Sequence, residues 1–133
     1  HGVRIVEDAE VAAGRITATG RIAAGVLEGH IPLEVCPTSN VHIRAFPSLA
    51  EHPLGMLYRA GFVVTLNTDN RLMSRTSMTD EWEAAVEYHG FGVDDLRAVT
   101  GNAVDAAFCA EDVRRRIAER VEAGFSDAGR EGG

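Results

Sequence analysis

Along most of the chain, from residue 3 to residue 125, short apolar runs alternate with longer stretches in which apolar residues recur at helical spacing. This pattern is typical of repeated strand–helix units, in which helices cover a parallel sheet. Residues 31–36 form a compact apolar run that Pro37 ends, and residues 62–66 are almost entirely apolar. Both runs are predicted as strands buried on both faces. The sequence therefore predicts an α/β fold.

Helices are predicted between and after these strands. Residues 15–28 carry apolar residues at helical spacing, although glycines interrupt the pattern and weaken the signal. Residues 53–60 are predicted as a helix because Pro53 suits a first helical turn and Gly61 suits a C-terminal cap. Three further helices are predicted over residues 79–88, after Asp94, and along the spacing of Val113, Ile117 and Val121.

Composition restricts the classes of function. The 133 residues include 13 Lys+Arg against 20 Asp+Glu, giving a net charge of -7, so we expect no nucleic-acid partner. Cys36 and Cys109 lie outside any C-x-x-C pattern, and no apolar run approaches the roughly 20 residues that span a bilayer. We expect a cytoplasmic protein with no membrane segment, folded over residues 1–125 and ending in a flexible tail over residues 126–133.

Three polar segments occupy positions at which strands give way to helices. They are residues 1–8, 36–40 and 67–70. In parallel strand–helix folds, functional side chains gather at such junctions because the carboxyl ends of the strands share one open face. Each segment taken alone is also explained by helix capping, for which Asp, Asn, Ser and Thr are the common residues.

The order of these segments resembles the C-terminal half of the adenosine deaminase family. The matching stretches are HGVRIVED, LEVCPTSN and HPLGMLYRAGFVVTLNTDN, followed by RLMSRTSMTDEW and DLRAVTGNAVDAAF, which resemble the last helices of a bacterial branch. The resemblance implies a portion of a (β/α)8 TIM barrel, from the end of strand 6 through strand 8 and the terminal helices. Since such barrels typically have about 250 residues, and since the chain opens on His1 and not on Met, we expect a fragment lacking the N-terminal part of the barrel.

The resemblance also implies a metal. In this family one zinc ion is held by three histidines and one aspartate, and Asp69 in N-T-D matches the aspartate. A carboxylate among imidazoles leaves zinc a position for water, whose pKa the ion lowers. The alternative is an ordinary helix-capping Asp. The H-x-H pair, the third zinc histidine and a glutamate that protonates purine N1 have no match in the chain, so we expect the fragment to be inactive alone.

Three further residues match the family's site. His1 matches the histidine beside the zinc-bound hydroxide, Asn70 stands where many relatives have an aspartate that donates to purine N7, and Ser39 matches a serine that supports the catalytic histidine. Their alternatives are a surface terminal residue for His1, a turn residue for Asn70 and a helix N-cap for Ser39. The other histidines lack ligand spacing and are interpreted as loop or cap residues: His30, His42, His52 and His89.

The function implied by the resemblance is hydrolysis of adenosine and 2'-deoxyadenosine to the inosine compounds and ammonia, with a purine nucleoside as substrate, in purine salvage. Two alternatives remain open at this point. One is a related deaminase acting on adenine or aminodeoxyfutalosine, which shares the H-G and N-T-D motifs. The other is a non-catalytic binding module derived from the barrel.

Overall fold

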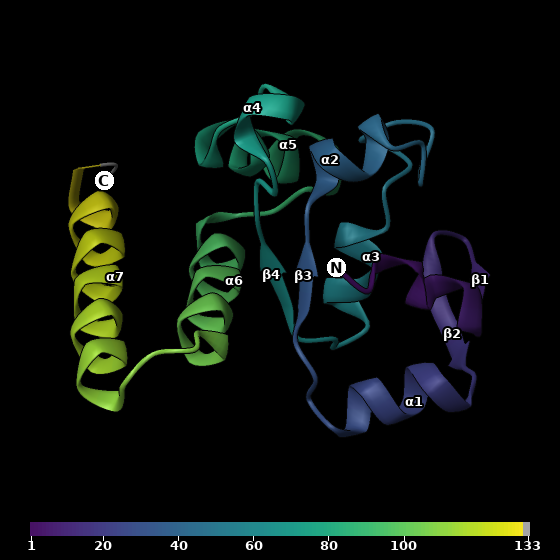
Figure 1. The fold of residues 1–133 in the computed structure, drawn as a ribbon, viewed down its shortest axis with the longest axis horizontal. Coiled ribbons are helices and arrows are strands. Elements are labelled where there is room, and N and C mark those ends of the chain that lie inside the picture. The colour runs from purple at the N-terminus through teal and green to yellow at the C-terminus, as the bar shows by residue number, and fades with distance from the viewer. Residues whose placement is uncertain (132–133) are drawn as a thin grey trace.

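A two-stranded parallel sheet lies at the centre of the molecule (Figure 1). The computed structural model describes residues 1–131, with side chains described as far as residue 127. In the sheet, β3 (Leu33–Val35) pairs with β4 (Val64–Leu66), Leu33 lying opposite Val64. Both predicted strands are thus confirmed, each shorter than its apolar run, and the fold is α/β as expected.

The connection from β3 to β4 runs through two short helices. α2 (Pro37–His42) begins directly after β3, with Pro37 in its first turn. α3 (Leu54–Arg59) confirms the helix predicted over 53–60, although Pro53 precedes it as N-cap and does not lie in its first turn. Because both strands run the same way, α2 and the segment after β4 start at the same end of the sheet (Figure 1).

The first 30 residues differ from the sequence prediction. After a 3-10 helix, η1 (Val3–Asp8), the chain forms an antiparallel hairpin of β1 (Ala9–Ala12) and β2 (Arg15–Thr19), and only then the helix α1 (Arg21–Glu28). The helix predicted from residue 15 is therefore wrong for residues 15–19. Ala13 and Gly14, with φ of 49° and 70°, make the tight turn that this hairpin requires.

Asp8 determines where α1 starts. Its Oδ2 accepts hydrogen bonds from the backbone N–H groups of Ile22 and Ala23, each at 2.8 Å. Gly20 is packed against this carboxylate so closely that an added Cβ would lie 2.6 Å from Asp8 Cγ. The first-turn donors of the helix are thus satisfied by a residue 14 positions upstream, which no local helical periodicity reveals.

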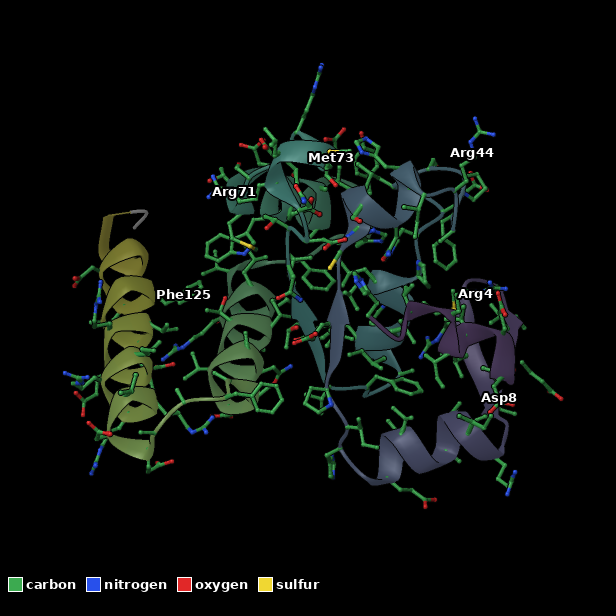
Figure 2. All side chains as sticks on the ribbon, in the orientation of Figure 1. Arg4, Asp8, Arg44, Arg71, Met73 and Phe125 are labelled. Carbon is green, nitrogen blue, oxygen red and sulfur yellow. The ribbon has the colours of Figure 1, made fainter. Side chains whose placement is uncertain are left out.

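Four helices follow β4: α4 (Arg71–Ser74), α5 (Met78–His89), α6 (Val93–Ala106) and α7 (Glu111–Glu131). The last three confirm the helices predicted there, and Gly90 ends α5 in a left-handed conformation. α7 lies outside α6, and Phe125 faces inward from it toward Trp82, with ring centroids 6.0 Å apart (Figure 2). Of the predicted tail, residues up to Glu131 continue α7, and residues 132–133 lie outside the described part.

The core forms where the sheet meets α3, α5 and α6. Its most buried members are Val35, Val64, Leu54, Leu57 and Ala85, none of which is exposed. This cluster holds the carboxyl ends of β3 and β4 in a fixed relation, which positions the polar loops that follow them. No helix among the described residues is long and apolar enough to cross a membrane.

Candidate active site

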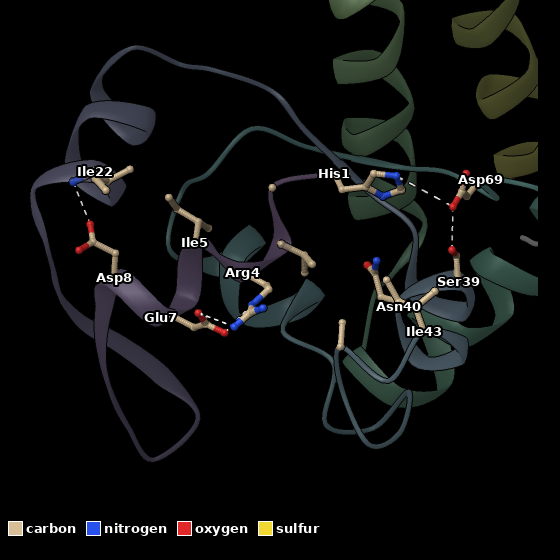
Figure 3. Close-up of a pocket in the computed structure, with 13 residues that line it drawn as sticks. His1, Arg4, Ile5, Glu7, Asp8, Ile22, Ser39, Asn40, Ile43 and Asp69 are labelled. Atoms are coloured by element: carbon tan, nitrogen blue, oxygen red, sulfur yellow. Dashed lines mark hydrogen bonds and ion pairs between the residues drawn. The ribbon is translucent and has the colours of Figure 1, made fainter.

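An open cavity of about 700 Å³ lies beside the carboxyl ends of the two parallel strands (Figure 3). The N-terminal segment up to Asp8, the start of α2 and the loop after β4 all contribute to its lining. Its polar lining includes His1, Ser39, Asn40 and Asp69. Segments up to 68 residues apart in the chain are therefore brought to one place, as the parallel-strand argument predicts.

Asp69 is held in an unusual conformation at this cavity. Its φ is +55°, a left-handed backbone that costs most non-glycine residues about 1–3 kcal/mol and that Asp tolerates better than most. The side chain is 41% exposed, and its Oδ2 accepts a hydrogen bond of 2.7 Å from Ser39 Oγ. The carboxylate is thus oriented by a neighbour while remaining accessible from the cavity.

His1 lies next to the same carboxylate. Its Nε2 is 4.0 Å from Asp69 Oδ2, an ion pair when the imidazole is protonated. Gly2, with φ of +76°, carries the chain over β3 so closely that a Cβ there would lie 2.8 Å from Leu33 Cδ2. The glycine of the H-G motif therefore has a physical reason, since it lets the segment bearing His1 approach the strand end.

Ser39 has a different partner from the one expected. Its hydroxyl donates to Asp69 and makes no hydrogen bond with His1 among the described residues. The alternative interpretation of Ser39 as a helix N-cap is wrong, because Cys36 occupies that position of α2. The side chain is buried and reaches Asp69 across the ends of both strands. Its contact supports the candidate metal ligand directly.

Asn70 caps the short helix α4. Its Oδ1 accepts a hydrogen bond of 3.0 Å from Met73 N. The turn role considered for Asn70 is therefore present in the structure. The side chain is exposed and lies outside the cavity lining, and its Nδ2 makes none of the hydrogen bonds found in the described part of the chain. The amide is held by its oxygen, with its two N–H donors available.

Glu81 is a residue of this region that the sequence does not reveal. Although it is charged and lies in the first turn of α5, it is completely buried. One carboxylate oxygen accepts from Thr38 N at 3.2 Å and the other from Thr76 Oγ1 at 2.8 Å. Glu81 thereby ties the start of α2, next to Ser39, to the segment that follows α4. A single glutamate in an acidic helix start gives no sequence signal for such a role.

Two of the histidines interpreted as loop or cap residues, His52 and His89, are buried. His52 is 3% exposed, and its Nδ1 does cap α3 by accepting from Leu54 N at 3.2 Å. Burial, aided by the neighbouring His89, lowers the pKa of His52 to about 4. His89 lies at the end of α5, where burial and the charge of Arg59 lower its pKa. The interpretation of His52 as a cap at a helix start is thus confirmed, while His89 is the last residue of α5.

Cys36 is the small buried core residue that the sequence predicts. Burial, followed by the negative charge of Asp69, raises the pKa of its thiol to about 11. A neutral thiol is a poor nucleophile and a poor metal ligand. Among the described side chains, moreover, no three His, Cys, Asp or Glu gather as a metal site. The candidate metal ligand, Asp69, has an accessible carboxylate that accepts a hydrogen bond from Ser39.

Comparison with known proteins agrees with this geometry. Adenosine deaminase of Mycobacterium ulcerans is 50% identical over 121 residues, which are 91% of this chain and 33% of that protein. The crystal structure of an adenine deaminase from Arthrobacter aurescens matches 95% of this chain and 35% of its own with a TM-score of 0.81 and 26% identity. The apo structure of the N6-methyl-AMP deaminase from Arabidopsis thaliana covers 81% of this chain with a TM-score of 0.67 and 28% identity.

The chain spans about a third of the length of the curated relatives it matches. The family model that describes adenosine deaminases matches residues 1–124, which include every segment of the cavity and both parallel strands. The motifs that first indicated the resemblance are thus embedded in a match over nearly the whole chain. The protein belongs to the adenosine deaminase family.

Proposed function

We propose that residues 1–133 supply the C-terminal third of a zinc-dependent adenosine deaminase, from the end of strand 6 of its barrel through strand 8 and the terminal helices. The complete enzyme hydrolyses adenosine and 2'-deoxyadenosine to the inosine compounds and ammonia. The observation that carries this proposal is the cluster of Asp69, Ser39 and His1 at the carboxyl ends of β3 and β4. Active sites of such barrels lie at that end of the strands.

The donor set of Asp69 fits one position of a zinc site. A monodentate carboxylate is a usual zinc ligand, and the hydrogen bond from Ser39 to Oδ2 leaves Oδ1 free of partners among the described side chains. When bound, zinc supplies a Lewis acid and lowers the pKa of a coordinated water. The remaining ligands come from outside this chain in our proposal, because one carboxylate does not hold the ion by itself.

The chain's own residues then have separate roles. His1, beside Asp69, accepts or donates a proton at Nε2, because an imidazole does both near neutral pH. Asn70 donates from Nδ2 to the purine ring, while its bond to Met73 N holds the amide in place. Ser39 orients the Asp69 carboxylate. An Asn amide donates at any pH, whereas an Asp in that position donates only when protonated.

The sheet supports the idea that a larger barrel completes this chain. Among the described residues, β3 pairs only with β4 and β4 only with β3, so each strand has one edge without a strand partner. Unpaired edges of buried parallel strands are not stable in isolation. In the proposed enzyme, neighbouring barrel strands occupy both edges, and the upstream part closes the open side of the cavity near His1.

A chimera tests the proposal. The upstream two thirds of the Mycobacterium ulcerans enzyme, fused before His1, is expected to give a folded protein that binds one zinc ion per chain and releases ammonia from adenosine. The isolated chain is expected to release none. An Asp69→Asn variant should lose zinc and activity, while Ser48→Ala, on an exposed loop, should lose neither. A folded chimera without activity, or an active isolated chain, would refute the proposal.

Two alternatives are a deaminase that acts on adenine or aminodeoxyfutalosine and a binding module without catalytic activity. A relative named adenosine deaminase is 50% identical, against 26% for the adenine deaminase structure, which favours adenosine. Comparing turnover of adenosine, adenine and aminodeoxyfutalosine by the chimera decides among the deaminases. A non-catalytic module is supported only if the chimera folds and neither binds zinc nor turns over any of the three.

A further inference from the structure

A buried chain of hydrogen bonds runs from the backbone of α3 to the cavity. Leu54 N donates to His52 Nδ1 at 3.2 Å, and His52 Nε2 lies 3.1 Å from Asn40 Oδ1. His52 and Asn40 are 3% and 2% exposed. The first group is a backbone N–H at the start of a helix, which can only donate and has no acceptor within the helix. The last residue, Asn40, lines the cavity.

The backbone determines the tautomer of His52. Because Nδ1 accepts from Leu54 N–H, it carries no proton, so the proton of the neutral ring is on Nε2. The burial that lowers the pKa of this ring keeps it neutral at physiological pH. The other aromatic neighbours, Phe46 and His89, meet the ring edge-on and offer its nitrogens no competing hydrogen bond.

The tautomer in turn determines the orientation of the Asn40 amide. A protonated Nε2 is a donor, so the atom it meets must be the amide oxygen, and the amide nitrogen must point elsewhere. Asn40 Nδ2 makes none of the hydrogen bonds found among residues 1–131. Among the described side chains, His89 Nε2 is the one fully enclosed nitrogen or oxygen atom without a hydrogen-bond partner. Asn40 Nδ2, which also has no partner, is therefore not fully enclosed. Because buried polar groups are ordinarily hydrogen-bonded, a free donor of a buried side chain at a cavity wall calls for a partner in the cavity.

We propose that Asn40 is a substrate-contacting residue whose Nδ2 donates to a neutral acceptor of the purine nucleoside, a ring nitrogen or a hydroxyl oxygen, and that His52 is the positioning residue that aims it. Asn40 extends from α2 into the same cavity as Ser39 and Asp69 (Figure 3). This inference rests on the proposed function for the identity of the ligand. The orientation of the amide does not.

The orientation is tested in the complete enzyme without any substitution. Nitrogen chemical shifts of the His52 ring, assigned by comparison with a His52→Leu variant, are expected to show a protonated Nε2 and an unprotonated Nδ1. A protonated Nδ1 would overturn the inference, whatever the enzyme's activity. If the unmodified enzyme shows the expected tautomer but has no deaminase activity, the proposed function is refuted, whereas the orientation of the Asn40 amide is confirmed.

The contact with substrate is tested by kinetics. Asn40→Ala is expected to raise KM for adenosine about 3- to 10-fold, the effect of one lost hydrogen bond, with kcat within about twofold. Asn102→Ala is the matched control, because its amide donates to Val64 O at 2.9 Å and lies outside the cavity lining. It should lower the unfolding midpoint without changing KM. An unchanged KM in a folded Asn40→Ala enzyme would overturn the contact.

A double variant separates positioning from simple support of the fold. His52→Leu should raise KM as Asn40→Ala does, and the combination should be no worse than Asn40→Ala alone, because both remove the same contact. Additive increases would overturn the positioning role. Nucleoside analogues that lack one ring nitrogen or one hydroxyl then identify the acceptor. For the analogue that lacks the acceptor, Asn40→Ala should leave KM unchanged.

Discussion

Acidification is expected to destabilise this protein through His52. The folded protein keeps the pKa of this ring at about 4, mainly because the ring is buried, against 6.5 for an exposed histidine. The unfolded chain therefore takes up a proton as the pH falls through 6.5, and the folded protein does so only near pH 4. The contribution of His52 to the free energy of unfolding is constant above this window and falls within it, by about 3 kcal/mol in total at ~1.4 kcal/mol per pKa unit.

Urea unfolding of the complete enzyme between pH 7.5 and 4 measures this effect. The upper pH lies roughly one unit above the start of the transition, and the lower pH lies at its end. His52→Gln, which keeps an N–H donor toward Asn40, should flatten the pH dependence by about 3 kcal/mol, leaving the smaller contribution of His89, whose pKa is also lowered by burial. Asn102→Ala provides the control, because it removes a hydrogen bond to Val64 O but no titratable group, and it should leave the slope unchanged. An equally steep slope in His52→Gln would refute the reasoning.

Three other predictions concern Ser39, Glu81 and the Asp8 cap of α1. Ser39→Ala removes the hydrogen bond to Asp69 Oδ2 and should lower zinc affinity of the complete enzyme about 10- to 100-fold, read by metal-buffer titration, whereas a change below twofold would contradict the contact's role. Glu81→Leu leaves Thr38 N without its buried acceptor and should cost about 1–3 kcal/mol of unfolding free energy. Gly20→Ala displaces the Asp8 cap and should cost about 1 kcal/mol, while Gly25→Ala, with open space around it, should stabilise α1 by about 0.5–1 kcal/mol; equal thermal shifts for the two would count against the cap.

Much of the fold was predictable because its signals are local. β4 is buried on both faces, Leu33 and Val35 of β3 are buried, and α5 ends at a glycine with φ of 69°, so neighbouring residues carry the information. The β1–β2 hairpin was not predicted, because in β2 only Ile16 is even half-buried and its alternation with Ala18 is too short to distinguish a strand from a helix. Its register comes from the turn geometry and from packing against the rest of the chain.

The candidate site divides in the same way. The positions of Asp69 and Ser39 after two buried strands, and the order of the motifs around them, were readable from the chain and led to the adenosine deaminase family. The hydrogen bond between the two was not, because it joins residues 30 positions apart. Nor was the hydrogen bond between His52 and Asn40, which are 12 positions apart.

The sequence by itself determined most of the elements and the end of the sheet at which polar side chains gather, and it made Asp69 the candidate metal ligand. Tertiary structure alone decided which donor meets which acceptor there. Glu81 and Thr38, for example, are 43 positions apart, and their contact exists only because α5 packs against the start of α2. The physical reason is that periodicity and capping act over a few neighbouring residues, whereas burial and hydrogen-bond partners depend on how distant segments pack.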